Sequence, residues 1–330
     1  MPFKFPLSNG FPNISIPSPA LLAIEKAAHG TLPNTPLAKS LSATSVTDLQ
    51  VIATNEMFEV AYFTSLIANI TNGVSGYEVA GREKTIILEA LTAIVNQEQL
   101  HALGANAILA AAGQPMVAPC EYVFGVDNLS DAINIARTFT DLVVSTLQSV
   151  QADFAADGDA EYIPLIGSII GQESEQIGGF RLYLDLIPSA LPFLTASTGQ
   201  FAYSALNQLF LVPGSCPSAP MIKVPVFAPL TVTTMPIEPK TQTLSFSMEG
   251  MNSTDFSLVY INQQNLPIVE KPSNVQMSGS MVTFDAEFPY DMYLMNGLTI
   301  AAVTPTAGPF ANAVAVSEVA LAGPGLIEIM

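Results

Sequence analysis

The chain has 330 residues, enough for one to three domains, and 49% of them are hydrophobic, which excludes global disorder. Charged residues make up only 12%, with 28 Asp and Glu against 10 Lys and Arg, so the formal net charge is -18. This balance argues against nucleic acids and anionic membrane surfaces as partners, since both require clustered basic residues, and no apolar stretch reaches the roughly 18 residues that span a bilayer.

The first 45 residues are rich in Pro, Ser and Asn and predict an extended segment with one short helix at 19–29, where His29 is a candidate C-terminal cap. Four long segments then show the apolar spacing of amphipathic helices, the first with Ser45 as candidate N-cap, and each stops close to a Gly or Pro. They span residues 46–70, 78–112, 130–156 and 160–187, and a shorter helix is expected at 196–210. Four such helices predict a four-helix bundle, in which the long connection at 113–129 can cross from one end to the other.

Residues after about 220 change character, because Pro and Thr become frequent and polar and apolar residues alternate. Short strands are expected at 243–248, 256–261 and 281–285, about 10–15 residues apart with turn residues between them, which predicts a small antiparallel β-sandwich. Five prolines between 213 and 229 indicate a linker. The predicted fold is therefore mainly α plus a β domain: an N-terminal segment at 1–45, a helical bundle at 46–215, a linker at 216–229 and a β-sandwich at 230–330.

Polar residues interrupt the apolar stripe at mid-length in three of the four long helices. They are Glu56 with Glu59 on the first helix, Glu98 and His101 on the second, and Glu173 and Gln176 on the fourth. An i, i+3 spacing puts each pair on one helix face. A single such helix would be read as rotated, with these residues facing solvent. Because three helices carry polar residues at the same position along their length, these side chains are expected to meet in the core of the bundle. A carboxylate buried there costs several kcal/mol unless it is paired or coordinated.

The residues around these positions resemble the ferritin-like superfamily, and more narrowly the eukaryotic ferritin-like domain family, which includes fungal late-sexual-development and stress-response proteins and plant desiccation-related proteins. The resemblance rests on Asn55-Glu-Met-Phe-Glu-Val-Ala-Tyr-Phe63, Asn96-Gln-Glu-Gln-Leu-His101 and Gly171-Gln-Glu-Ser-Glu-Gln176. The last string is most similar to the fungal branch. The likeness spans roughly residues 45–215 and excludes the C-terminal strands.

The resemblance implies a metal site with one Glu and one Glu-x-x-His in each half of the bundle. The positions that correspond are Glu56, Glu98 and His101 in the first half, and Gln148, Glu173 and Gln176 in the second. Gln148 stands where a Glu is expected and Gln176 where a His is expected, and amides are poor ligands for iron or manganese. The resemblance thus implies one iron or manganese ion, or none, rather than a full di-iron centre. It does not imply iron storage, which requires a cage.

Interior carboxylates have few cationic partners in this sequence. Between residues 85 and 222 the only basic residues besides His101 are Arg137 and Arg181. Arg137 is expected to pair with Asp141 one turn along its helix, and Arg181 to point away from Gln176. A metal ion or a retained proton is therefore expected to balance the carboxylates.

Two cysteines, Cys120 and Cys216, lie in Pro-rich loop contexts, which favours a disulfide over two free thiols. Four Asn-X-Ser/Thr sequons occur, at Asn13, Asn69, Asn128 and Asn252, and are candidate glycosylation sites. The first residues show no signal peptide, so either the protein is intracellular or a leader lies outside this numbering. The disulfide and the sequons favour a secreted protein.

The leading hypothesis is a secreted or cell-surface ferritin-like protein associated with stress or development, with a reduced metal site and with cell-wall or homo-oligomer contacts. The first alternative is a metal-dependent oxidase or oxygenase whose ligands are Glu56, Glu98, His101 and Glu173. The second is an enzyme that binds a small molecule inside the bundle and uses the carboxylates as acid and base. The residues assign no catalytic group.

Overall fold

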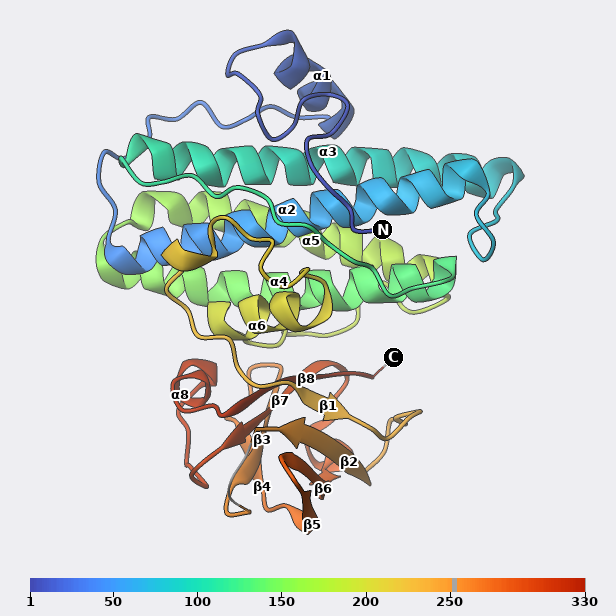
Figure 1. Ribbon diagram of the computed structural model, residues 1–330, viewed down its shortest axis with the longest axis vertical. Coiled ribbons are helices and arrows are strands. Elements are labelled where there is room, and N and C mark those ends of the chain that lie inside the picture. The colour runs from blue at the N-terminus through green and yellow to red at the C-terminus, as the bar shows by residue number, and fades with distance from the viewer. Residues whose placement is uncertain (251–253, 330) are drawn as a thin grey trace. The chain divides into compact units, whose positions relative to one another are not determined.

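The computed structural model describes residues 1–250 and 254–329, with helices in the first two thirds of the chain and strands in the last third (Figure 1). Two compact units share the chain, and each combines segments that are distant in sequence. The first unit comprises Met1–Ile135, Asp153–Ala160 and Leu209–Val224, and the second comprises Ala136–Ala152, Glu161–Gln208 and the chain from Pro225 onward.

The helices lie close to their predicted positions. They are α1 (Pro19–Ala28), α2 (Ala43–Asn72), α3 (Gly81–Ala111), α4 (Leu129–Asp157), a 3-10 turn at Ala160–Tyr162, α5 (Ile163–Tyr183) and α6 (Gly199–Leu209). The predicted class, a helical region followed by antiparallel strands, is confirmed. So is the role of His29, which caps α1 with a left-handed backbone.

Two helix ends differ from prediction. The N-cap of α2 is Ser42 and not Ser45, because the Ser42 hydroxyl accepts the backbone N–H of Ser45 at 2.9 Å. Helix α5 ends at Tyr183 and not at residue 187, because the backbone N–H of Leu186 turns back to the carbonyl of Arg181 at 2.8 Å. Polar capping contacts of this kind leave little trace in apolar periodicity.

Helix α2 is buried on every side through its middle, since each residue from 49 to 63 is buried. An interior helix has no solvent-facing stripe, which explains why the acidic positions of α2 are buried whichever way they face. Within the first unit α2 packs along α3, and α1 covers α3. Eight residues lie between α2 and α3, and the first of them, Gly73, forms the left-handed C-cap of α2.

The loop that follows α3 is held at several points in the first unit. The Asn106 side chain exchanges two hydrogen bonds with the backbone of Val117, at 2.7 and 3.0 Å. A disulfide joins Cys120 to Cys216, which confirms that prediction. Beside it, Tyr122 forms backbone bridges to Phe3 on one side and Leu211 on the other.

The strands of the second unit form two antiparallel four-stranded sheets. One sheet has the order β1 (Leu230–Val232), β2 (Gln242–Glu249), β6 (Met281–Phe288) and β5 (Ser273–Ser278). The other has the order β4 (Ile268–Glu270), β3 (Ser257–Asn262), β7 (Gly297–Thr304) and β8 (Ala322–Ile329). Short helices α7 (Tyr290–Tyr293) and α8 (Ala313–Ser317) lie between the strands, and a 3-10 turn at Ala219–Met221 precedes them.

The central strands β3 and β7 are buried on both faces, as their unbroken burial shows. Leu258 and Tyr260 enter the core shared with the other sheet. The alternate residues Val259 and Ile261 enter a second core that contains Phe201 of α6. One sheet therefore covers two cores, and the second core joins it to helices of the same unit.

A buried ion pair links α4 to the last strand. Arg137 has no exposed surface, and its Nη1 donates to Glu328 on β8 at 2.8 Å. Asp141 hydrogen-bonds to the same Glu328, and burial, then the negative Glu328, raise the pKa of Asp141 well above its usual value. Arg137 thus forms a long-range pair with Glu328, and its charge also acts on Asp141, one turn along the helix, where it opposes the rise of the pKa. Arg181 instead donates through Nε to the carbonyl of Ile187 at 2.6 Å.

Replacing Arg137 by Met should lower the free energy of unfolding by about 3–5 kcal/mol, because Glu328 then stays buried without a counter-charge. The double variant Arg137→Met, Glu328→Met should recover most of this loss. Urea unfolding followed by circular dichroism measures both. As a control, Arg82→Met alters an exposed residue and should change stability by less than about 0.5 kcal/mol. Equal effects of R137M and R82M would contradict the structural role of the pair.

A half-buried carboxylate, that of Asp48, lies near the start of α2. Burial first, and then the nearby Asp153 and Asp157, raise the pKa of Asp48 to about 8. Its Oδ2 is buried without a hydrogen-bond partner in the described part of the chain. The folded state holds this proton more tightly than the unfolded state. The contribution of Asp48 to the free energy of unfolding is therefore complete below about pH 4 and is lost as the pH rises through 8, by at most about 1.4 kcal/mol per pH unit.

The variant Asp48→Asn keeps the shape of the protonated side chain, and its free energy of unfolding at pH 8 should exceed that of the wild type by up to about 5 kcal/mol. At pH 4 the two proteins should be equally stable. Thermal unfolding across this pH range gives the comparison, with the exposed Asp127→Asn as control. A pH-independent difference between D48N and wild type would show that the Asp48 proton is not the cause.

Candidate metal centre

Two helices of the first unit bring an imidazole and two carboxylates together. The Nδ1 atom of His101 lies 2.8 Å from Oε2 of Glu98 and 3.4 Å from Oε2 of Glu56. Glu98 and His101 are one turn apart on α3, and Glu56 comes from α2. The three residues predicted for the first half of the site therefore meet.

Local sequence explains how α3 presents its two polar residues inward. Its buried residues recur at three- and four-residue intervals, through Leu91, Ile94, Val95, Glu98 and Ala102, so Glu98 falls on the apolar face. The side chains of Glu56 and Glu98 are 1% and 0% exposed and that of His101 is 15% exposed. This burial excludes the reading in which the acidic residues face solvent.

The electrostatics of the three residues show a shortage of positive charge. The pKa of Glu56 is raised to about 7, mainly by burial, although His101 opposes the shift. Burial lowers the pKa of His101, but Glu98 and Glu56 together raise it well above its usual value. An imidazolium therefore serves both carboxylates through one Nδ1–H, which can point at only one of them. Glu98 has the shorter contact with Nδ1, at 2.8 Å, and Oε2 of Glu56 has the longer one, at 3.4 Å.

Glu173 and Gln176 lie one turn apart on α5 and are both buried, at 0% and 6% exposure. One ligand atom each from Glu56, Glu98, His101 and Glu173 lies within 4.8 Å of the other three. The candidate metal-ligand group among the described residues thus has four members. Glu59, the further carboxylate considered from sequence, is buried on α2 outside this group.

Gln148 has both ends of its amide occupied within the second unit. Its Nε2 donates to the carbonyl of Thr195 at 2.9 Å, and its oxygen accepts from Nε2 of Gln264 at 2.9 Å. Gln148 therefore anchors the loop before α6 to the turn after β3. Periodicity along α4 carries no trace of this role, because both partners lie far away in sequence.

The residues present fit a single divalent transition-metal ion. The Glu56 carboxylate is buried, its Oε1 has no hydrogen-bond partner among the described residues, and its Oε2 lies 3.4 Å from an imidazole that Glu98 also contacts, an arrangement that a cation would satisfy. The imidazole faces the carboxylates with Nδ1, so an ion there would take the place of the proton. Carboxylate oxygens with one imidazole nitrogen suit iron or manganese better than they suit a structural zinc site, which favours Cys and His.

Comparison with known proteins agrees with this geometry. Residues 44–185 match the family model of the ferritin-like domain. These residues span α2 to α5 and include all four members of the metal-ligand group, so the part of the chain that is similar to the ferritin-like domain is the part that carries this group. No curated protein matches the chain.

The sequon asparagines differ in accessibility. Asn13 is exposed, while Asn69 and Asn128 are half-buried. Asn128 also caps α4, because its side-chain oxygen accepts the N–H of Asp131 at 2.9 Å. Asn252 lies outside the described residues. Among the residues described, none of the helices combines the length and hydropathy needed to cross a bilayer.

Proposed function

We propose that the ferritin-like domain binds one divalent iron or manganese ion through Glu56, Glu98, His101 and Glu173. The observation that carries this proposal is the buried Glu56 carboxylate, which shares a single imidazolium with Glu98 and whose Oε1 has no hydrogen-bond partner among the described residues. Three carboxylates and a neutral imidazole carry three negative charges, which a divalent ion reduces to one. When bound, such an ion supplies Lewis-acid and one-electron redox chemistry.

A single ion is favoured over a pair because the second half of the site is incomplete. Gln176 replaces the second histidine, and the amide of Gln148 is held by Thr195 and Gln264. One imidazole and three carboxylates provide too few anionic ligands for two ions that also need bridging groups. The same shortage supports a protein that does not store iron.

Titration of the metal-free protein with Mn²⁺ should show one equivalent bound, with heat measured by calorimetry and content by elemental analysis. The variant Glu173→Gln should weaken binding by about 100-fold, since it replaces an anionic ligand by a neutral amide. Glu175→Gln alters an exposed residue of the same helix and should bind like the wild type. Affinity should fall as the pH drops from 7.5 to 5.5, because Glu56 and His101 then hold protons that compete with the metal.

Two results would refute the metal proposal. The first is a wild-type protein, purified without chelators and supplied with iron and manganese, that retains less than about 0.1 equivalents of metal. The second is indistinguishable binding by E173Q and E175Q.

We further propose that the protein functions outside the cytosol, in association with stress or development. The Cys120–Cys216 disulfide and the exposed Asn13 sequon support an oxidising, glycosylating compartment. The link with stress or development rests on the narrower resemblance to fungal late-sexual-development proteins.

Peptide mass spectrometry of the native protein should find an N-glycan at Asn13 and no free thiol. Treatment with an N-glycosidase should convert Asn13 to Asp and reduce the mass accordingly. Unmodified sequons together with two alkylatable cysteines would place the protein in a reducing compartment instead.

A further inference from the structure

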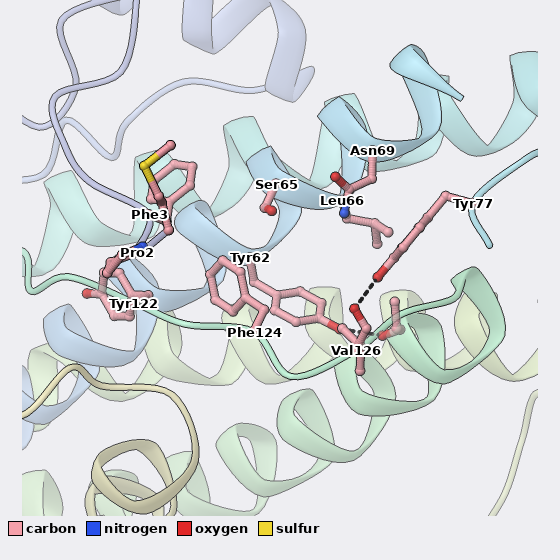
Figure 2. Close-up of a pocket in the computed structure, with 12 residues that line it drawn as sticks. Pro2, Phe3, Tyr62, Ser65, Leu66, Asn69, Tyr77, Tyr122, Phe124 and Val126 are labelled. Atoms are coloured by element: carbon pink, nitrogen blue, oxygen red, sulfur yellow. Dashed lines mark hydrogen bonds between the residues drawn. The ribbon is translucent and has the colours of Figure 1, made fainter. Parts of the chain in front are cut away.

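A half-open cavity of about 310 Å³ lies in the first unit and involves none of the metal-ligand group (Figure 2). It forms where the N-terminal segment, α2, the loop at 122–126 and the start of α4 meet. Five aromatic rings line it, from Phe3, Tyr62, Tyr77, Tyr122 and Phe124. We call it the aromatic cavity.

Hydrogen bonds to backbone carbonyls hold two of these rings in place. The Tyr62 hydroxyl donates to the carbonyl of Ala132 at 2.7 Å, and the Tyr77 hydroxyl donates to that of Val126 at 2.8 Å, the bond visible in Figure 2. Both hydroxyl groups are therefore already hydrogen-bonded within the cavity wall. What they offer to an occupant is their ring surface.

The opposite wall is fixed by the backbone. Tyr122 is bridged to Phe3 by two hydrogen bonds, at 2.7 and 3.2 Å, and to Leu211 on its other side. The Cys120–Cys216 disulfide holds the same loop two residues earlier. A cavity whose walls are already ordered loses little conformational entropy when it binds a ligand.

The lining sets the charge of the occupant. None of the side chains that line the aromatic cavity is acidic, basic or histidine, and the one charged group among the lining residues is the α-amino group of the exposed Met1. A cationic ligand would therefore lose its hydration without gaining a counter-ion. Two polar side chains of α2, Ser65 and Asn69, are half-buried there. The Ser65 hydroxyl has no hydrogen-bond partner in the described part of the chain and is available to a ligand, whereas Asn69 already interacts with Tyr77.

The geometry of the rings favours an aromatic occupant. Tyr62 and Phe124 meet edge to face, with centroids 5.2 Å apart and planes at 85°, and Figure 2 shows them side by side. A further ring can continue such edge-to-face contacts. A sugar fits poorly, because each of its several buried hydroxyls would need a partner and the lining side chains supply about two.

We infer that the aromatic cavity binds a small neutral aromatic molecule that carries one hydroxyl, with that hydroxyl directed to Ser65. A dry cavity of about 150 Å³ holds one benzene ring, so twice that volume takes two fused rings. The inference is independent of the proposed metal site, because no residue is shared between the two.

Binding of 2-naphthol tests the inference. Its emission anisotropy can be followed directly, because the chain contains no Trp. We expect one site per chain with a dissociation constant between about 1 μM and 1 mM, the range of small ligands of this size. The cationic analogue 2-(aminomethyl)naphthalene, for which the lining offers no anionic group, should bind at least about tenfold more weakly.

Two matched variants locate the site. Ser65→Leu fills the cavity from α2 and should weaken 2-naphthol binding by at least about tenfold. Thr64→Leu alters the neighbouring half-buried residue of α2, which does not line the cavity, and should leave affinity within about twofold. Phe124→Leu removes a ring from the wall without filling the cavity and should also weaken binding.

Three results would overturn the inference: no saturable 2-naphthol binding up to about 1 mM, equal affinity of S65L and T64L, or displacement of 2-naphthol by glucose. Circular dichroism confirms folding of each variant, and F124L decides the case if S65L does not fold. Manganese binding should be the same in S65L and wild type, so loss of 2-naphthol binding and loss of the metal proposal are separate outcomes.

Discussion

Carboxylates buried with very few cations are the constraint on which this protein's interior depends. Glu56 and Glu98 share the single imidazole of His101, and Glu328 relies on Arg137. Ionised groups in a poorly hydrated interior must be neutralised by a partner, a proton or a metal. The buried carboxylates are neutralised in different ways at β8 and in the metal-ligand group.

At β8 the solution is structural. Arg137 neutralises Glu328, and Asp141 keeps a proton, so α4 and the last strand are held together without further ions. In the metal-ligand group the negative charge is not fully neutralised, since one imidazolium serves both Glu56 and Glu98. A group of carboxylates with uncompensated negative charge can accept a cation, whereas an ion pair that is already neutral cannot.

The rest of the molecule supplies the stability that offsets the free-energy cost of burying these charges. Helix α2 is buried through its middle, which removes the Glu56 carboxylate from water. In the second unit, strands β3 and β7 bury both faces, so a single sheet stabilises two cores. The disulfide fixes the loop that borders the aromatic cavity. Large apolar cores and a covalent link offset the cost of burying several charges.

The sequence by itself determined the helical and strand segments and the four residues of the metal-ligand group, because these depend on periodicity and on polar residues that interrupt the apolar stripes of three helices. It also indicated the disulfide, because both cysteines lie in Pro-rich loop contexts. Only the tertiary structure revealed that Arg137 pairs with Glu328, 191 residues away, and that Gln148 binds Thr195 and Gln264. The aromatic cavity also appeared only there, since its rings come from four separate segments. The physical reason is the same in each case: periodicity records which face of an element is buried, but not which distant residue meets it.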